Sequence, residues 1–237
     1  MDTIALTSVP PTAAGSFAHA SAPVRLRVTE IYKSIQGEST FAGLPCIFIR
    51  TTGCNLRCVW CDSAYSFYGG SWMTLDAIMA EVEKLDCALV EITGGEPLLQ
   101  PGTPLLAQRL QRAGKTVLVE TSGERPIETL PDGVIRIMDL KCPDSGESER
   151  NRLENIAHLQ PRDEIKFVLA SRRDYEFARD KIREHNLGAR VNSVLLSVVF
   201  GKLQPVQVVD WMLEDQLPAR FQLQMHKFIW DPLKKGV

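Results

Sequence analysis

Several features that mark other protein classes are scarce in this 237-residue sequence. Lys and Arg number 27 against 29 Asp and Glu, so the basic excess typical of nucleic-acid-binding surfaces is missing. No apolar run is long enough to span a bilayer. Residues 1–23 contain no Lys or Arg, whereas a secretory signal begins with basic residues and a mitochondrial presequence is rich in Arg. We therefore expect a cytoplasmic protein without nucleic-acid or membrane partners.

The overall composition indicates one globular domain. Hydrophobic residues make up 44% of the chain and charged residues 24%, which suits a domain with a sizeable core. Residues 1–24 are rich in Ala, Ser, Thr and Pro, and we expect them to form a flexible N-terminal tail. Residues 25–237 are predicted to form the single domain.

Short apolar runs alternate with stretches of helical periodicity. Because the runs are short and rich in Val, Ile and Leu, we expect strands buried on both faces. They are residues 46–50, 88–93, 116–120, 134–140, 165–169, 194–200 and 221–225. The last run, FQLQM, alternates apolar and polar residues and predicts a strand with one polar face. Helices are predicted at residues 74–85, 103–113, 174–185 and 205–214. This alternation predicts an α/β fold with a parallel sheet.

Polar and Gly residues gather at the carboxyl ends of these predicted strands. They are Gly53, Cys54, residues 93–96 and 121–123, Asp139, Lys141, His226 and Lys227. Strands often end in turn residues, so one such end means little. Repetition over several strands favours a shared site, because in (β/α) barrels this end carries the active site.

Three of the six cysteines form a CX3CX2C motif, Cys54, Cys58 and Cys61. Clustered thiols in a reducing compartment are more often metal ligands than disulfides. Three thiolates can bind three irons of a 4Fe–4S cubane and leave the fourth iron open to a small molecule. The alternatives are structural cysteines or a zinc site, which normally recruits two paired ligand sets. The remaining cysteines are expected to be buried small residues: Cys46, Cys87 and Cys142.

This motif, with the aromatic Trp60 before the third cysteine, resembles the radical S-adenosylmethionine superfamily. A second motif, Thr93-Gly-Gly-Glu-Pro97, follows a predicted buried strand. Paired glycines allow a ligand to approach the backbone closely. In the superfamily this element holds the amino group of S-adenosylmethionine, so the two motifs imply the same ligand.

The order of motifs from Val28 to Pro232 is similar to that of one family, 7-carboxy-7-deazaguanine synthase. The motifs are residues 34–39 (SIQGES), 48–54, 61–63, 93–97, 120–123 and 224–227. Ile-Gln-Gly-Glu is the discriminating element, although alone it would indicate an ordinary Gly turn. The resemblance implies an incomplete (β/α) barrel with about six parallel core strands and a C-terminal strand.

The resemblance also implies a reaction. It is the radical ring contraction of 6-carboxy-5,6,7,8-tetrahydropterin to 7-carboxy-7-deazaguanine with loss of ammonia, a lyase step of 7-deazapurine and queuosine biosynthesis. The implied cofactors are a 4Fe–4S cluster, S-adenosyl-L-methionine and Mg²⁺. The implied partners are an external one-electron reductant and a second copy of the chain.

Site residues carry over position by position. The substrate would contact Ile35, Gln36, Gly37, Glu38, Arg50, Thr93 and Pro232. S-adenosylmethionine would contact Trp60, Cys61, Asp62, Gly95, Glu96, Ser122, Asp139, Leu140, Lys141 and Ser197. The metal ligands would be Cys54, Cys58 and Cys61 for the cluster and Ser63 for Mg²⁺.

Two of these positions, and three further residues near the motifs, have alternatives. Arg50 would clamp the substrate carboxylate, since a guanidinium binds a carboxylate bidentately, or it would be a surface Arg. The Ser63 hydroxyl would bind Mg²⁺ or belong to a simple turn. Arg57 would offset cluster charge or be a solvated loop residue. His226 and Lys227 would act in the site or be structural polar residues.

Two segments depart from the pattern of many relatives. Asp139-Leu-Lys141 stands where many relatives have Ser-Pro-Lys, and Ser197 lies where some have a Gln-Pro segment.

Two other functions fit part of the pattern. An activase that makes a glycyl radical on a partner protein would share the CX3CX2C loop and the barrel, without needing residues 35–38 or Arg50. A zinc-binding module without catalysis would leave residues 94–97 unexplained.

Overall fold

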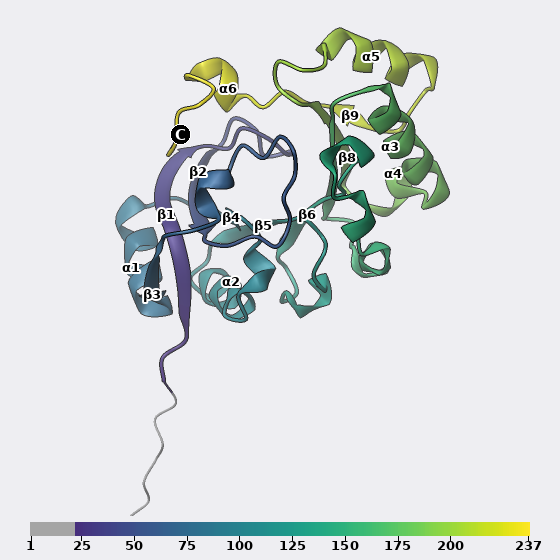
Figure 1. Ribbon diagram of the computed structural model, residues 1–237. Coiled ribbons are helices and arrows are strands. Elements are labelled where there is room, and N and C mark those ends of the chain that lie inside the picture. The colour runs from purple at the N-terminus through teal and green to yellow at the C-terminus, as the bar shows by residue number, and fades with distance from the viewer. Residues whose placement is uncertain (1–21) are drawn as a thin grey trace, which may run out of the picture.

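The computed structural model describes residues 22–237, drawn in Figure 1. Its described part contains one curved, open sheet with the strand order β3-β1-β2-β4-β5-β6-β7-β8-β9. The parallel strands are β2 (Pro45–Thr51), β4 (Leu89–Gly94), β5 (Thr116–Thr121), β6 (Ile135–Asp139), β7 (Glu164–Leu169), β8 (Ser193–Val198) and β9 (Arg220–Phe221). The predicted incomplete barrel, six parallel core strands and a C-terminal strand, is therefore confirmed. Most of the predicted tail, residues 1–21, lies outside the described residues.

Two antiparallel strands extend the sheet on one side: β1 (Arg25–Ile35) and β3 (Ser71–Thr74). The sequence analysis did not predict them. The sequence of β1, RLRVTEIYKSI, mixes charged and apolar residues and many of its side chains are partly exposed. Such a strand lacks the continuous apolar run that marks a central parallel strand.

The four predicted helices are present as α1 (Leu75–Leu85), α2 (Thr103–Arg112), α3 (Arg172–Glu184) and α5 (Pro205–Glu214). Figure 1 shows them along the outer side of the curved sheet. Two one-turn helices, α4 (Leu187–Arg190) and α6 (His226–Ile229), were not predicted. The polar region 143–160 folds into three short 3₁₀ turns.

The helix ends follow local capping chemistry. The Thr74 side chain accepts a hydrogen bond from the Ala77 amide, as expected for an N-cap. Gly114 follows α2 with a φ of 76°, the left-handed conformation that glycine adopts most easily. Helix α3 begins two residues earlier than predicted, because Ser171 accepts from the Asp174 amide and caps the helix there.

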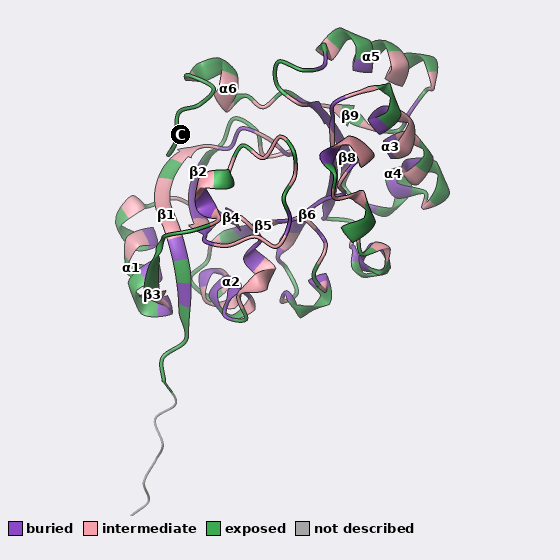
Figure 2. Ribbon diagram, in the orientation of Figure 1, coloured by how far each residue is buried: buried purple, intermediate pink, exposed green. Residues whose placement is uncertain are grey.

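The two faces of the sheet bury different kinds of residue. Alternate side chains on the outer face are apolar and pack in one core with residues of α1 and α2; they include Ile47, Ile49, Val90, Ile92, Val117 and Val119. The positions between them point into the concave side and include Phe48, Arg50, Glu91, Thr93, Glu120, Asp139, Lys166 and Val168. Strands largely buried on both faces were predicted, and Figure 2 shows this burial. What differs is that the concave face buries charge.

The prediction of a strand over residues 221–225 is wrong beyond Phe221. Strand β9 covers two residues, after which the chain leaves the sheet. The Gln222 side chain accepts from the Ser39 amide, and the Met225 amide donates to the Gly37 carbonyl. Polar groups of this segment are thus satisfied by the loop between β1 and β2, which replaces the ladder that a longer strand would need.

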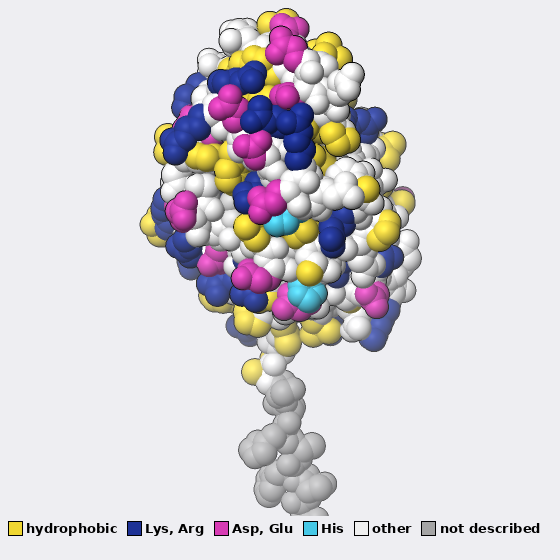
Figure 3. Space-filling model, turned by 90° about the vertical axis from the view of Figure 1, so that its right-hand side faces the viewer, with side chains coloured by type: hydrophobic (Ala, Val, Ile, Leu, Met, Phe, Trp, Pro, Cys, Tyr) yellow, Lys and Arg dark blue, Asp and Glu magenta, His cyan; other side chains and the backbone are white. Residues whose placement is uncertain are grey.

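The surface does not concentrate one sign of charge on the face drawn in Figure 3, where basic and acidic side chains are interspersed. In the part of the chain that the structure describes, no helix has the length and apolar character needed to cross a membrane.

Candidate functional site

A cavity of about 510 Å³ opens on the concave side of the sheet. Every predicted substrate contact lines it, as do all three motif cysteines, Ser63, and the predicted cofactor contacts Trp60, Asp62, Gly95, Ser122, Asp139 and Lys141. Three predicted cofactor contacts are not among its lining residues: Glu96, Leu140 and Ser197. The structure thus brings most of the predicted residues to one place, at the carboxyl ends of the parallel strands.

The thiols of Cys54, Cys58 and Cys61 lie on the loop that follows β2, and all three are free. Arg57 holds this loop together, since its Nη1 donates to the carbonyls of Cys54 (2.8 Å) and Leu56 (2.7 Å). Its guanidinium also lies over the Phe67 ring, 4.3 Å from the centroid. Arg57 therefore shapes the cysteine loop, a role that the sequence analysis did not consider.

The donor set of this loop suits an iron–sulfur cluster. Burial raises the pKa of the Cys58 thiol to about 11, and burial likewise raises that of Cys54, so these thiols lose their protons when a metal binds. The three thiols lie on one loop and all line the cavity, and three thiolates are the ligand set that binds three irons of a 4Fe–4S cluster.

The second motif packs directly against the cysteine loop. A Cβ on Gly95 would lie 2.1 Å from the Gly53 carbonyl oxygen, so only glycine permits this approach. The Glu96 amide donates to the same oxygen at 2.8 Å. The two motifs, 40 positions apart in the sequence, are therefore held backbone to backbone beside the cavity.

Glu96 itself is fully buried and lies behind the cavity. Its carboxylate accepts from the Leu98 amide, the Thr121 hydroxyl, and the amide and hydroxyl of Ser122. The structure therefore places Glu96 as the residue that fixes Ser122 and the end of β5.

Arg50 is anchored along one edge. Its Nε pairs with Glu30 at 2.8 Å, and its Nη2 donates to the Tyr32 hydroxyl at 3.1 Å. Tyr65 donates to the same Glu30 oxygen at 2.7 Å. Burial disfavours the charge, but Tyr32, Tyr65 and Glu30 hold the pKa of Arg50 above its ordinary value. Nη1 has no hydrogen-bond partner among the described residues and remains available to an anion in the cavity.

Ser63 forms the hydrogen bonds of its turn through the backbone carbonyl, and its hydroxyl takes no part in the turn. Its carbonyl accepts from the amide and hydroxyl of Ser66, at 2.9 and 2.7 Å. Its hydroxyl lies 3.7 Å from the Cys61 sulfur and lines the cavity. The turn and an oxygen ligand for Mg²⁺ are therefore compatible at this position.

Known proteins are similar to this chain in sequence. The Radical SAM superfamily model matches residues 48–138. A 7-carboxy-7-deazaguanine synthase of Koribacter versatilis is 52% identical over 227 residues, which cover 90% of this chain and 100% of the relative. The chain belongs to the 7-carboxy-7-deazaguanine synthase family. The synthase of Chlorobaculum tepidum is 45% identical, with 90% of this chain and 97% of the relative covered.

Solved structures support the fold of this family member. The crystal structure of QueE from Escherichia coli matches with a TM-score of 0.65 and 21% identity, covering 85% of this chain and 95% of that one. Streptococcus suis SuiB bound to S-adenosylmethionine matches with a TM-score of 0.51 and 13% identity, covering 73% and 45%.

The cavity also contains residues that the sequence analysis did not assign to the site. Lys166 and Glu120 meet there in a salt bridge, and Lys166 also contacts Glu38 at 3.1 Å and Asp139 at 3.6 Å. The sequence did contain a signal for Lys166, because it is a charged residue within the apolar run 165–169. Side chains alternate between the two faces of a strand, and Lys166 lies on the same face as Asp139.

Glu91 is another unassigned carboxyl group in the cavity wall. Burial, with the charge of Glu120, raises the pKa of Glu91 well above its ordinary value. Gln36 donates to it through Nε2 and accepts from the Glu38 amide at 3.1 Å. Glu91 thus orients the loop that carries the predicted substrate contacts.

The C-terminal segment completes the site. His226 and Lys227 both line the cavity, and Lys227 pairs with Asp62 at 3.0 Å. A Cβ on Gly37 would lie 2.4 Å from the His226 ring, so the absence of a side chain at Gly37 leaves room for the histidine. The residues beyond Pro232, 233–237, line the cavity as well, and Lys235 lies 4.4 Å from the centroid of the Tyr65 ring. Figure 1 shows the C-terminus beside β1.

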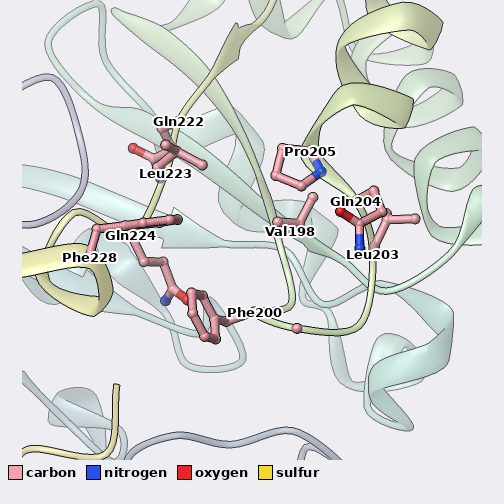
Figure 4. Close-up of a pocket in the computed structure, with 10 residues that line it drawn as sticks. Val198, Phe200, Leu203, Gln204, Pro205, Gln222, Leu223, Gln224 and Phe228 are labelled. Carbon is pink, nitrogen blue, oxygen red and sulfur yellow. The ribbon is translucent and has the colours of Figure 1, made fainter. Parts of the chain in front are cut away.

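A smaller cavity of about 170 Å³ adjoins the first and is drawn in Figure 4. Its walls are mostly apolar, and it shares Phe200 and Gln224 with the larger cavity. Ser197, the predicted cofactor contact nearby, is fully buried, and its hydroxyl has no hydrogen-bond partner among the described residues.

The other cysteines lie largely as expected. Cys46 and Cys142 are buried, and burial raises the pKa of both thiols. Cys87 is only partly buried and donates to the Pro45 carbonyl at 3.1 Å.

Proposed function

We propose that this chain converts 6-carboxy-5,6,7,8-tetrahydropterin into 7-carboxy-7-deazaguanine with loss of ammonia, as a step of 7-deazapurine and queuosine biosynthesis. The chain would be a lyase that uses a 4Fe–4S cluster, S-adenosyl-L-methionine and Mg²⁺. The identity of 52% over nearly the full length of a named synthase is the observation that carries this proposal.

The cavity supports the proposal because its two sides suit different molecules. Cys54, Cys58 and Cys61 would hold the cluster on one side, next to the Gly95 backbone. When bound, the cluster and S-adenosylmethionine supply the one-electron radical chemistry that removes a hydrogen atom from C6 of the substrate. The protein contributes position, electrostatics and exclusion of water.

The substrate side would be formed by Arg50, Thr93 and the loop 35–38. Arg50, held along one edge by Glu30, would present its free Nη1 to the substrate carboxylate. This contact is charge-assisted and therefore stronger than a neutral hydrogen bond. The Ser63 hydroxyl would supply an oxygen ligand to Mg²⁺, and the bound ion would supply positive charge near the substrate carboxylate.

The cofactor side would be completed by Trp60, Asp62, Ser122, Asp139 and Lys141. Lys141 pairs with Asp139 at 2.9 Å, and both face the cysteine loop. Pro232 and residues 233–237 would cover the mouth and limit the access of water. Leu140 and Glu96 would act from behind the cavity by holding the strand ends.

The proposed partners follow from the chemistry. Radical generation starts from a reduced cluster, so an external one-electron reductant is needed. We also propose a homodimer and a cytoplasmic location. The glycyl-radical activase is not favoured, because an enzyme acting on a partner protein has no use for the anchored Arg50 and the ordered loop 35–38.

Anaerobic reconstitution tests the proposal. The purified chain, loaded with iron and sulfide and reduced, is mixed with Mg²⁺, S-adenosylmethionine and the tetrahydropterin, and products are separated by mass. We expect 7-carboxy-7-deazaguanine, with none from the C58A variant. A fully loaded cluster that cleaves S-adenosylmethionine without forming the deazaguanine would refute the assignment.

A further inference from the structure

We propose that Lys166 is a positioning residue that fixes the carboxylates of Glu38 and Glu120 as a paired acceptor for the amino-pyrimidine edge of the substrate. This inference rests on the proposed function and assigns the element that tells an amino-pyrimidine from its oxo analogue. We call Glu38 and Glu120 the acceptor pair.

The geometry places the lysine behind the two carboxylates. Lys166 projects from the concave face of β7, and its side chain is only 6% exposed. The side chains of Glu38 and Glu120 keep 18% and 27% exposure, and all three residues line the cavity. The carboxylates are therefore open to a ligand, while the ammonium lies at their back.

Each carboxylate is held from more than one side. Glu38 contacts Lys166 through one oxygen and accepts from the Gln224 amide through the other, at 2.9 Å. Glu120 contacts Lys166 through one oxygen and accepts from the Thr93 hydroxyl through the other, at 3.2 Å. A carboxylate oxygen accepts more than one hydrogen bond, so both retain capacity for a ligand donor.

The charges explain why a lysine is needed there. Two carboxylates in one cavity repel each other, and one would otherwise take up a proton. Burial disfavours an ammonium, but Glu120, Glu38 and Asp139 hold the pKa of Lys166 well above its ordinary value. Burial would raise the pKa of Glu38, but Lys166 and the Gln224 amide bring it below its ordinary value.

A pterin matches this arrangement at both ends. Its pyrimidine ring carries a 2-amino group and a ring N–H, which are neighbouring donors, and its 6-carboxylate lies at the opposite end. Arg50 lies on β2 and Glu120 on β5, with β4 between them. Two inter-strand steps span about 10 Å, comparable with the length of the bicyclic substrate.

The test compares two ligands that differ at one group. 6-Carboxypterin and 6-carboxylumazine, which has oxygen in place of the 2-amino group, are titrated into the full-length chain and binding is followed by fluorescence. Because hydrogen bonds to charged groups contribute about 1.5–3 kcal/mol, we expect the wild type to prefer the pterin by roughly tenfold to a hundredfold.

Three variants decide the role of Lys166. We expect K166M to reduce the preference to below about threefold, and K166R to restore most of it, since an arginine also pairs with carboxylates. R136M is the matched control. It breaks the buried pair of Arg136 with Asp163 (3.2 Å), which lies outside the cavity, and should keep the preference whatever it does to stability.

Equal weakening of both ligands by K166M, with the preference retained, would overturn the proposal. If circular dichroism shows that K166M does not fold, E120Q replaces it, and an unchanged preference there overturns the proposal in the same way. Failure of the proposed function gives a different pattern, in which the wild type forms no deazaguanine from the tetrahydropterin, whatever its preference between the two ligands.

Discussion

The buried carboxylate of Glu96 gives the most quantitative prediction about stability. It accepts four hydrogen bonds: from the Leu98 amide at 2.9 Å, the Thr121 hydroxyl at 2.8 Å, and the Ser122 amide and hydroxyl at 2.8 and 2.6 Å. In E96Q, one of the two oxygens becomes an NH₂ donor. Since each oxygen receives one backbone amide, either orientation of the glutamine turns a donor toward an N–H group.

A hydroxyl can rotate to accept from the new NH₂ group, but a backbone amide cannot. One buried N–H is therefore left unsatisfied, at a cost of about 1–3 kcal/mol, and the charge assistance of the other bonds is lost. We expect E96Q to lower the free energy of unfolding by about 2–4 kcal/mol, measured by urea denaturation of the cluster-free protein under reducing conditions.

The matched control is E81Q on α1. Glu81 pairs with Lys84 on the surface, where its side chain is 43% exposed, and such pairs contribute less than about 1 kcal/mol. A change in E96Q no larger than that in E81Q would refute the reasoning, because it would mean that Glu96 does not hold the Ser122 amide.

Three further predictions concern titration, the cysteine loop and the C-terminal segment. The pKa of Glu91 is raised in the folded state, so its contribution to stability is present below the unfolded value of about 4.5 and is lost as pH rises from there toward the folded value. The stability of E91Q relative to wild type should therefore increase as pH rises from 5 to 8, and a pH-independent difference in urea midpoint would contradict this. G95A should reduce the iron bound per chain several-fold, because its Cβ would lie 2.1 Å from the Gly53 oxygen; a full complement of iron would show that the loop can move without loss. Truncation after Pro232 should raise KM for the tetrahydropterin, because residues 233–237 line the cavity. It should not cause a comparable loss of bound iron, because the segment contains none of the three cluster cysteines. K234A serves as a control for charge alone, and an unchanged KM in the truncated chain would remove the segment from the site.

The sequence predicted the site best at positions where the chemistry or the sterics allow a single residue type. CX3CX2C and the Gly94-Gly95 pair predicted the wall of the cavity, because only thiolates suit the cluster and only glycine permits contact between the two loops. The parallel strands were also predictable, since their outer faces are continuous apolar surface.

The rest depended on contacts between distant segments. Lys166 and Glu38 are 128 positions apart, and nothing local in either segment indicates that they meet. Strand β9 ended early because Gln222 and Met225 bind the loop 36–39, a tertiary contact that overrides the alternating pattern of FQLQM. The motif predicted Glu96 as a cofactor contact, but it did not indicate that the Glu96 carboxylate accepts hydrogen bonds from Ser122, 26 positions away.

Isotope transfer tests the central claim most directly. The claim is that this cavity brings C6 of the pterin to the radical generated beside Cys54, Cys58 and Cys61. The reaction is balanced without net loss of hydrogen, so the abstracted atom is returned and the label can be found in recovered S-adenosylmethionine as well as in 5′-deoxyadenosine. With substrate carrying deuterium at C6, the account predicts deuterium at the 5′ carbon of the adenosyl group, measured by mass in both compounds. Deazaguanine formed while this carbon stays unlabelled in both would contradict it.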